Sequence, residues 1–273
     1  MKCINLCDIL DKSDLQGEIA EKLLQTPCIA DAGRLYIGSY FCSQYFLKMD
    51  FLSEIKKLID KKHIFLTLVI PIISEKDLEK SKEQIRHILE ELPIDEVTVN
   101  DVGMLSALFA IPQIRINLGR LFFKDARDIR LPAYYHCTLR PSLLNQLSDY
   151  RSRYGVQYAE LDPICSVMDL RNETDVKLAI HGPFGYLTTG NICKYASISK
   201  DIKCKFRPNI SCNKECQRVY ETYTKTLPDY ELYRIGRAVY FASVIPETIN
   251  GGFERSIYAP FHEMVKLRKE GSL

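Results

Sequence analysis

The stretch DEVTVND, residues 95–101, decides the fold that we expect for this chain. Its β-branched centre predicts a buried strand, and the strand ends in polar residues. The segment VGMLSALFA (102–110) has a helical pattern, and QIRINLG (113–119) predicts the next strand. This order of strand, helix and strand is typical of a βα unit in a parallel sheet.

The same order recurs along the chain. Further strands are predicted at RLYIG (34–38), IFLTLVI (64–70), VQYAELDP (156–163), DVKLAIHGP (175–183) and RAVYFASV (237–244). Helices are predicted at 51–63, 74–92, 142–155 and 255–269. Roughly eight such units predict a single (β/α)8 TIM-type barrel over residues 1–273. The alternatives are a barrel that is incomplete or open at its C-terminal end, and a doubly wound open sheet.

Polar residues stand at the C-terminal ends of the predicted strands. In a barrel these ends converge on one face, where active sites lie. We therefore expect this face to carry the site. The residues are Asn100, Asp101, Asn117, Glu160, Asp162 and His181.

Charge and hydropathy exclude several classes of protein. The formal net charge of +2 indicates no basic surface for nucleic acid. The longest apolar run, residues 64–73, is too short for a membrane span and contains Pro71. The N-terminal segment is broken by Asp8, Asp11 and Asp14, which is unlike a signal peptide. We expect a cytoplasmic protein.

Ten cysteines in a chain without a signal peptide argue against a disulfide scaffold. Isolated cysteines are usually small core residues, whereas clustered ones are more often ligands or catalytic groups. The first interpretation applies to Cys3, Cys7, Cys28, Cys137 and Cys165.

Four other cysteines are candidate metal ligands. Cys212 and Cys216 are four apart, so a helical turn would place both thiols on one side. Cys193 belongs to the same loop-like region, about 186–218, and Cys42 follows the strand RLYIG. Four converging thiolates suit an iron–sulfur cluster or zinc. Simple helix packing is the alternative, and Cys204 is a rival ligand.

The stretch AIHGPFGYLTTGNICKYASIS (179–199) resembles the signature of the peptidase U32 family. The family also shows counterparts of four other segments. They are RLYIGSYFCS (34–43), VTVNDVGML (97–105), INLGRLFFKDARDIR (116–130) and QYAELDP (157–163). Within the family, the closest resemblance is to the UbiU/UbiV-type proteins, which have a similar length.

This resemblance implies a [4Fe–4S] cluster on the cysteines that match Cys42, Cys193, Cys212 and Cys216, with a longer gap than usual between the second and third. It implies a part in oxygen-independent hydroxylation, with prephenate as oxygen donor and a second U32-family protein as partner in a hetero-oligomer. The older description of the family is a collagenase-type peptidase. A non-catalytic scaffold with a four-cysteine zinc site is the remaining alternative.

His181 is a candidate general acid or base, with Glu160 as its acidic companion. The candidate substrate contacts are Asn100, Asp101, Asn117, Arg120 and Asp162. Arg120, Arg127 and Arg130 together offer a clamp for a carboxylate such as that of prephenate. The structural alternatives are a hydrogen-bonded core histidine, a helix cap at Asp101 and a solvated basic loop. The chain carries no G-x-S-x-G, H-E-x-x-H or Walker A motif.

Overall fold

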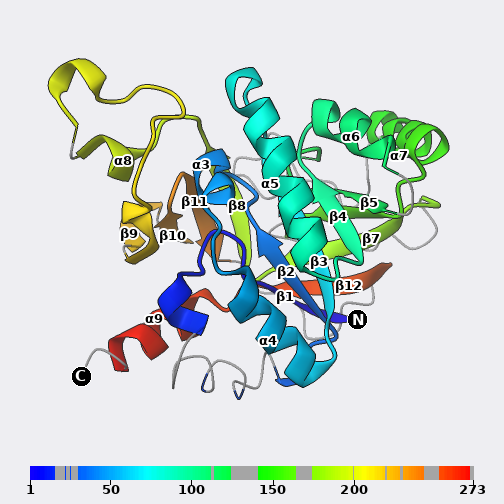
Figure 1. The fold of residues 1–273 in the computed structure, drawn as a ribbon, viewed down its shortest axis with the longest axis horizontal. Coiled ribbons are helices and arrows are strands. Elements are labelled where there is room, and N and C mark those ends of the chain that lie inside the picture. Colours follow the sequence, from blue (N-terminus) through cyan, green and yellow to red (C-terminus); the bar gives the residue numbers. More distant parts are fainter. Residues whose placement is uncertain are drawn as a thin grey trace.

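Eight parallel strands close into a barrel in the computed structural model (Figure 1). The structure describes residues 1–15, 22, 25, 30–111, 114–123, 141–163, 174–198, 200–218, 220–227, 230–242 and 252–270. The strand order is β1-β12-β7-β6-β5-β4-β3-β2, and β12 pairs with both β1 and β7. The TIM-type barrel is therefore confirmed. The incomplete or open barrel and the open sheet are wrong.

The barrel strands are short and largely buried. They are β1 (Lys2–Asn5), β2 (Arg34–Gly38), β3 (Phe65–Ile70), β4 (Glu96–Val99), β5 (Arg115–Leu118), β6 (Tyr158–Leu161), β7 (Lys177–Gly182) and β12 (Phe253–Tyr258). Their apolar side chains contact the surrounding helices on one face and the barrel interior on the other, which explains the near-continuous apolar runs in the sequence.

Helices cover the outside of the barrel. They are α3 (Ser43–Leu47), α4 (Leu52–Lys62), α5 (Leu78–Glu91), α6 (Val102–Phe109), α7 (Pro141–Tyr154) and α9 (Phe261–Glu270), with 3-10 turns η1 (Lys12–Leu15) and η2 (Glu75–Asp77). In α5 the buried face holds Ser81, Ile85 and Ile88, one helical turn apart. No helix in the described ranges is long and apolar enough to cross a membrane.

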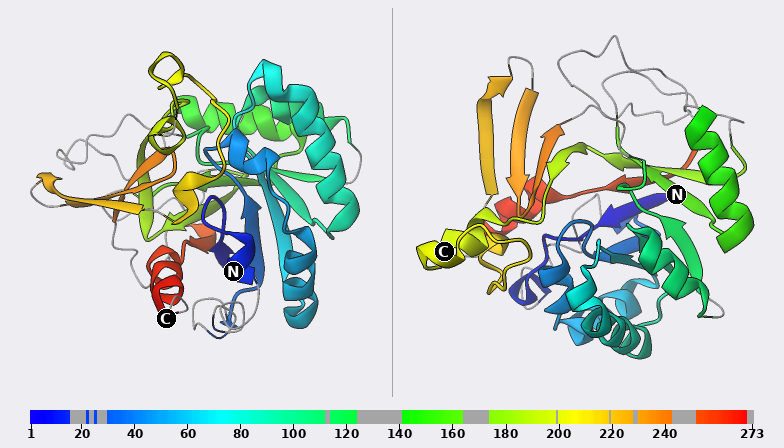
Figure 2. Two further views of the ribbon diagram at one scale, coloured as in Figure 1. Left: turned by 60° about the vertical axis from the view of Figure 1, so that its left-hand side comes forward. Right: turned by 90° about the horizontal axis from the view of Figure 1, so that it is seen from above.

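A second sheet is inserted between β7 and β12. It is antiparallel, in the order β8-β11-β10-β9, and stands beside the barrel (Figure 2). Its strands are β8 (Phe184–Thr189), β9 (Tyr220–Leu227), β10 (Tyr230–Ile235) and β11 (Ala238–Ala242). Between β8 and β9 the chain forms α8 (Lys194–Ile198), η4 (Ile202–Cys204) and η5 (Glu215–Arg218).

The sequence did not distinguish this sheet from the barrel. RAVYFASV was predicted as the last strand of the βα series, but it is β11, paired antiparallel with β10 and β8. A tight turn at Gly236, whose φ is 54°, makes the β10–β11 hairpin. The region from residue 186 was predicted as loop, whereas its first residues continue β8.

The prediction of a helix over 255–269 is wrong in its first part. Residues Phe253–Tyr258 form β12, and α9 begins only after Pro260. Arg255 and Ile257 are buried, while their neighbours are partly or fully exposed. This alternation is that of a strand, but one of its inward residues is a charged arginine, so the apolar pattern does not reveal it. The first strand, β1, also escaped prediction.

A buried ion cluster lies inside the barrel, toward the N-terminal ends of its strands. Arg255 on β12 binds Glu96 on β4 through two hydrogen bonds, of 2.5 and 3.1 Å. The Arg34 guanidinium lies 3.4 Å from the same carboxylate, and Thr67 donates to it at 2.8 Å. Burial opposes ionisation of Glu96, but Arg255, Arg34 and Thr67 together outweigh burial and lower the pKa of the carboxyl. The cluster joins four strands across the barrel.

Replacing Glu96 with Gln should therefore destabilise the fold. Two arginines would be left in the interior without a counter-charge, and breaking a buried pair of this kind costs about 3–5 kcal/mol. Urea unfolding monitored by circular dichroism measures the loss. Glu254→Gln is the matched control, because the Glu254–Lys177 pair is about half exposed and should contribute less than about 1 kcal/mol. Equal losses in both variants would contradict this account.

Candidate functional site

The C-terminal ends of the barrel strands form a polar face, as the sequence predicted. Tyr40 follows β2, Glu160 belongs to β6 and His181 to β7. These three side chains meet inside the mouth of the barrel, and all are 1% exposed or less. Hydrogen bonds between them show that the structure brings the predicted acid–base pair together.

Glu160 is the centre of this group. Its Oε2 accepts from the Tyr40 hydroxyl at 2.7 Å and lies 3.0 Å from His181 Nε2. Its Oε1 accepts from the Thr98 hydroxyl at 2.7 Å. Burial raises the pKa of this carboxyl to about 7, although the bonds from Thr98 and Tyr40 favour the charged form. Glu160 can therefore gain and lose a proton near neutral pH.

His181 is held as a neutral imidazole. Burial, followed by the positive charge of Arg120, lowers its pKa well below the ordinary value of 6.5. When Glu160 is ionised it only accepts hydrogen bonds, and Nε2 then carries the proton that points to it. Nδ1 is then left with a lone pair, and it has no hydrogen-bond partner within the described part of the chain. This nitrogen is the free basic atom of the site.

Asn117 lies one level deeper in the barrel, beside Thr98 of the neighbouring strand. Its side chain is fully buried, and neither amide atom has a partner among the described residues. Buried amides are normally hydrogen-bonded to protein or to ordered water. The structure thus places Asn117 below the acid–base pair, with unused hydrogen-bonding capacity.

Arg120 and Asp162, both predicted as substrate contacts, are paired with each other. Arg120 donates to both carboxylate oxygens of Asp162 and, at 3.0 Å, to the main-chain oxygen of Phe184. Four aromatic rings surround the guanidinium at 5.4–5.8 Å, from Tyr40, Phe41, Tyr186 and Tyr240. Arg120 therefore joins the barrel to the second sheet. Arg127 and Arg130 lie outside the described residues.

Asn100 and Asp101 have structural partners. Asp101 caps α6 by accepting from Met104 N at 2.7 Å, and it accepts from Ile73 N at 3.3 Å. Asn100 donates to the main-chain oxygen of Ile70 at 2.9 Å. A Cβ at Gly119 would lie 2.3 Å from the Asn100 side-chain oxygen, so only glycine fits there.

Asp8 was not predicted as a site residue, because the strand that precedes it, β1, was not recognised. Its carboxylate accepts from the hydroxyl of Ser39 and, at 2.9 Å, from Tyr40 N. Burial raises its pKa to about 6. A polar residue just after a short apolar run, LCD at 6–8, is the weak signal that could have indicated it.

The four candidate ligand cysteines come from two distant parts of the chain. Cys42 follows β2 and begins α3, where its Sγ accepts from Tyr45 N at 3.4 Å. Cys193 and Cys212 belong to a small buried cluster in the β8–β9 connection, and Cys216 packs against it. The thiols lie close enough to interact electrostatically. Cys204 is exposed.

One expectation about these cysteines is wrong. Cys212 and Cys216 do not share a helical turn, because η5 begins only at Glu215 and Lys214 has a left-handed backbone with φ 61°. They nevertheless interact, since both burial and the neighbouring thiols Cys42, Cys193 and Cys212 raise the pKa of Cys216. The irregular chain, rather than a helix, brings the two thiols together.

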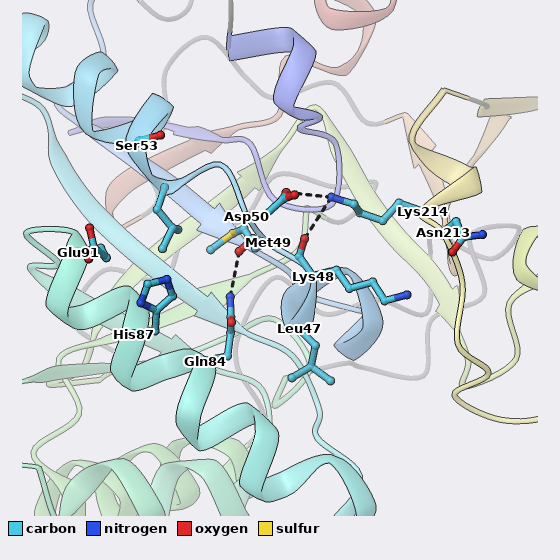
Figure 3. A pocket seen from close by; sticks show the side chains of 11 residues that line it. Leu47, Lys48, Met49, Asp50, Ser53, Gln84, His87, Glu91, Asn213 and Lys214 are labelled. Atoms are coloured by element: carbon cyan, nitrogen blue, oxygen red, sulfur yellow. Dashed lines mark hydrogen bonds and ion pairs between the residues drawn. The ribbon is translucent and has the colours of Figure 1, made fainter.

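Two lysines hold the cysteine segment against the barrel. Lys48, just after α3, donates to the main-chain oxygen of Cys212. Lys214 donates to the main-chain oxygen of Lys48 at 3.1 Å and to Asp50 at 3.3 Å (Figure 3). A groove of about 860 Å³ runs beside these contacts, between α5 and the cysteine segment. Cys42 and Cys212 are thereby fixed near each other.

Arg237 stabilises the other side of the cysteine segment. It is 6% exposed and donates to the main-chain oxygen of Gly190 at 2.9 Å and to the Asn209 side chain at 2.7 Å. Burial raises the pKa of Cys42 to about 11, and the positive charge of Arg237 opposes this rise. The charge of Arg237 favours the anionic form of the Cys42 thiol, which is the form that binds metal.

Metal ligation itself has no direct support in the geometry. In the ranges that the structure describes, no three His, Cys, Asp or Glu side chains are grouped as a ligand set. Three further cysteines, Cys28, Cys137 and Cys165, lie outside those ranges. Cys3 and Cys7 are buried, as expected for core residues.

Comparisons with protein-family models, with curated proteins and with solved structures gave no match to this chain.

The raised pKa of Glu160 makes stability depend on pH. A carboxyl whose folded pKa of about 7 exceeds its ordinary 4.5 adds stability below pH 4.5, and this is lost as pH rises through 7. Between pH 5 and pH 8, the loss from this group is about 2–3 kcal/mol. The Glu160→Gln variant should lack this pH-dependent loss of stability. Urea unfolding of both proteins at the two pH values tests this, and identical pH dependence in both would contradict it.

Proposed function

We propose that this protein binds a [4Fe–4S] cluster on Cys42, Cys193, Cys212 and Cys216, and that it acts beside that cluster as a component of an oxygen-independent hydroxylation system. The observation that supports the proposal is that Cys193, Cys212 and Cys216 pack in one cluster, and that Cys42, just after β2, is near enough to interact electrostatically with Cys212 and Cys216. Soft thiolate ligands select iron–sulfur clusters or zinc over hard cations.

Four cysteine thiolates are the ligands that a [4Fe–4S] cluster takes, although the described residues are not grouped as a ligand set in this structure. When bound, such a cluster carries single electrons and keeps no iron open to substrate. Any proton must therefore be handled by the protein. Glu160 and His181 supply that function, because one titrates near neutral pH and the other offers a neutral basic nitrogen. Electron and proton chemistry would thus be carried by different groups.

The resemblance to the UbiU/UbiV-type proteins extends the proposal to the reaction. It suggests hydroxylation without molecular oxygen, prephenate as oxygen donor and a second U32-family protein as partner. A carboxylate substrate would have to compete with Asp162 for Arg120, since the two are already paired. We therefore place the substrate nearer His181 Nδ1 than Arg120.

A Cys–His peptidase is less well supported. His181 makes its hydrogen bond to Glu160, whereas Cys193 packs in a different group with Tyr195 and Cys212. A thiolate nucleophile requires a base within hydrogen-bond reach, and the described residues contain no such Cys–His pair. The zinc scaffold uses the same four thiols and is separated from the cluster only by metal analysis.

Anaerobic purification followed by iron, sulfide and zinc analysis tests the proposal. We expect about four irons and four sulfides per chain. Single changes of Cys42, Cys193, Cys212 and Cys216 to Ala should each cause loss of most of the iron.

Cys204→Ala is the matched control, because this cysteine lies in the same connection but is exposed. It should keep the wild-type iron content. Bound zinc with no iron, or an equal loss of iron in the Cys204 variant, would contradict the cluster assignment.

A further inference from the structure

We propose that a loop between β8 and β9, defined here as residues 191–209, is a binding surface for anionic lipid membranes. The loop projects from the molecule beside α8 (Figure 1). Four of its apolar side chains are 49–89% exposed, namely Ile192, Ile198, Ile202 and Phe206. The surface requires no metal at the cysteines, so it is independent of the function proposed above.

The loop is closed at its base. Asn209 N donates to the main-chain oxygen of Asn191 at 2.8 Å. Arg237 of β11 donates to the side-chain oxygens of both residues, at 2.7 Å to Asn209 and at 3.4 Å to Asn191. A chain whose two ends are joined in this way leaves and re-enters the fold at one place. The residues between the ends therefore form one protruding unit.

The middle of the loop is held by Ser197, which is 1% exposed. Its hydroxyl donates to the main-chain oxygen of Cys193 at 2.7 Å and accepts from Phe206 N at 3.1 Å. Phe206 has a left-handed backbone, with φ 55°, which is rare for a bulky residue. Such a conformation persists only where the surrounding contacts impose it. The loop thus presents the Phe206 ring to solvent from a fixed backbone.

The exposed apolar side chains gather on this unit. Ile198, Ile202 and Phe206 recur at every fourth position, and the bond from Phe206 N to Ser197 brings the last of them back beside the first. Ile202, on η4, is 89% exposed. Single exposed apolar residues are normal on a protein surface, whereas a group of them marks a place of interaction.

The charge of the loop differs from that of the rest of the chain. Five basic residues and one acidic residue give it a net charge of +4, while the whole chain has +2, so the remainder carries −2. The positive charge is therefore concentrated on the loop. The basic residues are Lys194, Lys200, Lys203, Lys205 and Arg207, and the acidic residue is Asp201.

This combination favours lipid over the other kinds of partner. The cores of protein interfaces are depleted in lysine, which is the commonest charged residue of the loop. Surfaces for single-stranded nucleic acid stack bases on several aromatic rings, whereas Phe206 is the exposed aromatic residue of the loop. At an anionic membrane, aliphatic side chains enter the acyl boundary and basic ones bind the headgroup phosphates.

The test is sedimentation of the full chain with two kinds of vesicle, one of phosphatidylcholine alone and one of phosphatidylcholine mixed with phosphatidylglycerol. Partition onto the mixed vesicles should be at least about tenfold stronger, because each basic residue near an anionic surface adds attraction. In about 1 M salt, where the Debye length falls to about 3 Å, this preference should disappear.

Variants of the loop separate the two contributions. Removal of one charge, in Lys203→Gln or Arg207→Gln, should weaken binding to the mixed vesicles about fivefold. Ile202→Ser or Phe206→Ser should weaken it about tenfold, because the apolar side chain no longer leaves water. All four side chains are exposed, so thermal unfolding of each variant should match that of the wild type.

Matched controls come from outside the loop. Lys57 on α4 and Phe109 at the end of α6 are also exposed. Lys57→Gln and Phe109→Ser should bind the mixed vesicles as the wild type does.

Fluorescence reports the contact directly, because the chain contains no tryptophan. Phe206→Trp places a single reporter on the loop. Its emission should shift to the blue and be quenched by brominated lipid when mixed vesicles are added. Phe109→Trp is the control, and its emission should not change.

Equal binding to both kinds of vesicle, or loop variants that bind as the wild type does, would overturn the inference. An unchanged emission of Phe206→Trp on vesicles that carry the protein would also overturn it. Two further outcomes would assign the loop to another partner and equally overturn the inference. One is binding to a single-stranded RNA oligonucleotide with none to vesicles. The other is a dimer that Ile202→Ser dissociates, again with no vesicle binding.

Discussion

The position of β12 between β1 and β7 is the constraint on which the rest of the structure depends. Because β12 runs parallel to β7, the chain leaves β7 at the C-terminal face of the barrel and has to return to the opposite end, where β12 begins. The antiparallel sheet starts directly after β7, so β8 and the cysteine-rich connection follow the barrel mouth. Closure of the barrel, with β7 held between β6 and β12, thus fixes where this insertion leaves the rim.

Burial acts on two carboxylates in the barrel, but their pKa values shift in opposite directions because their surroundings differ. Glu96 faces two arginines, so its charge is neutralised and its pKa falls despite burial. Glu160 faces neutral donors from Thr98, Tyr40 and His181, so burial dominates and its pKa rises. The first carboxylate joins the strands at one level of the barrel. The second is left free to exchange a proton at the end where the cysteines lie.

The barrel could be predicted because its strands are apolar and regularly spaced, and Glu160 and His181 because polar residues at strand ends converge on one face. The second sheet could not, since apolar strands do not show whether their partner is parallel or antiparallel. Strand β12 was hidden by its inward-pointing Arg255, whose partner, Glu96, is distant in sequence. Asp8 was missed for the same reason as β1, because a run of four residues carries too little pattern.

The pairing of Arg120 with Asp162 shows a second limit of the sequence. Each residue alone has the chemistry of a substrate contact. Only the fold reveals that the two side chains form an ion pair with each other. For the cysteines the reverse holds. Their spacing suggested a shared helix that does not exist, yet Cys216 still interacts electrostatically with Cys212. The sequence therefore points to residue types at strand ends and in loops, whereas their partners and local conformation depend on the fold.

Mössbauer spectroscopy of protein reconstituted anaerobically with ⁵⁷Fe and sulfide tests the central claim most directly, because it reports the ligands of every iron. The account predicts one cluster in which all irons have tetrahedral sulfur coordination. A spectrum of iron bound only to oxygen or nitrogen, or no bound iron in a protein that retains zinc, would contradict it.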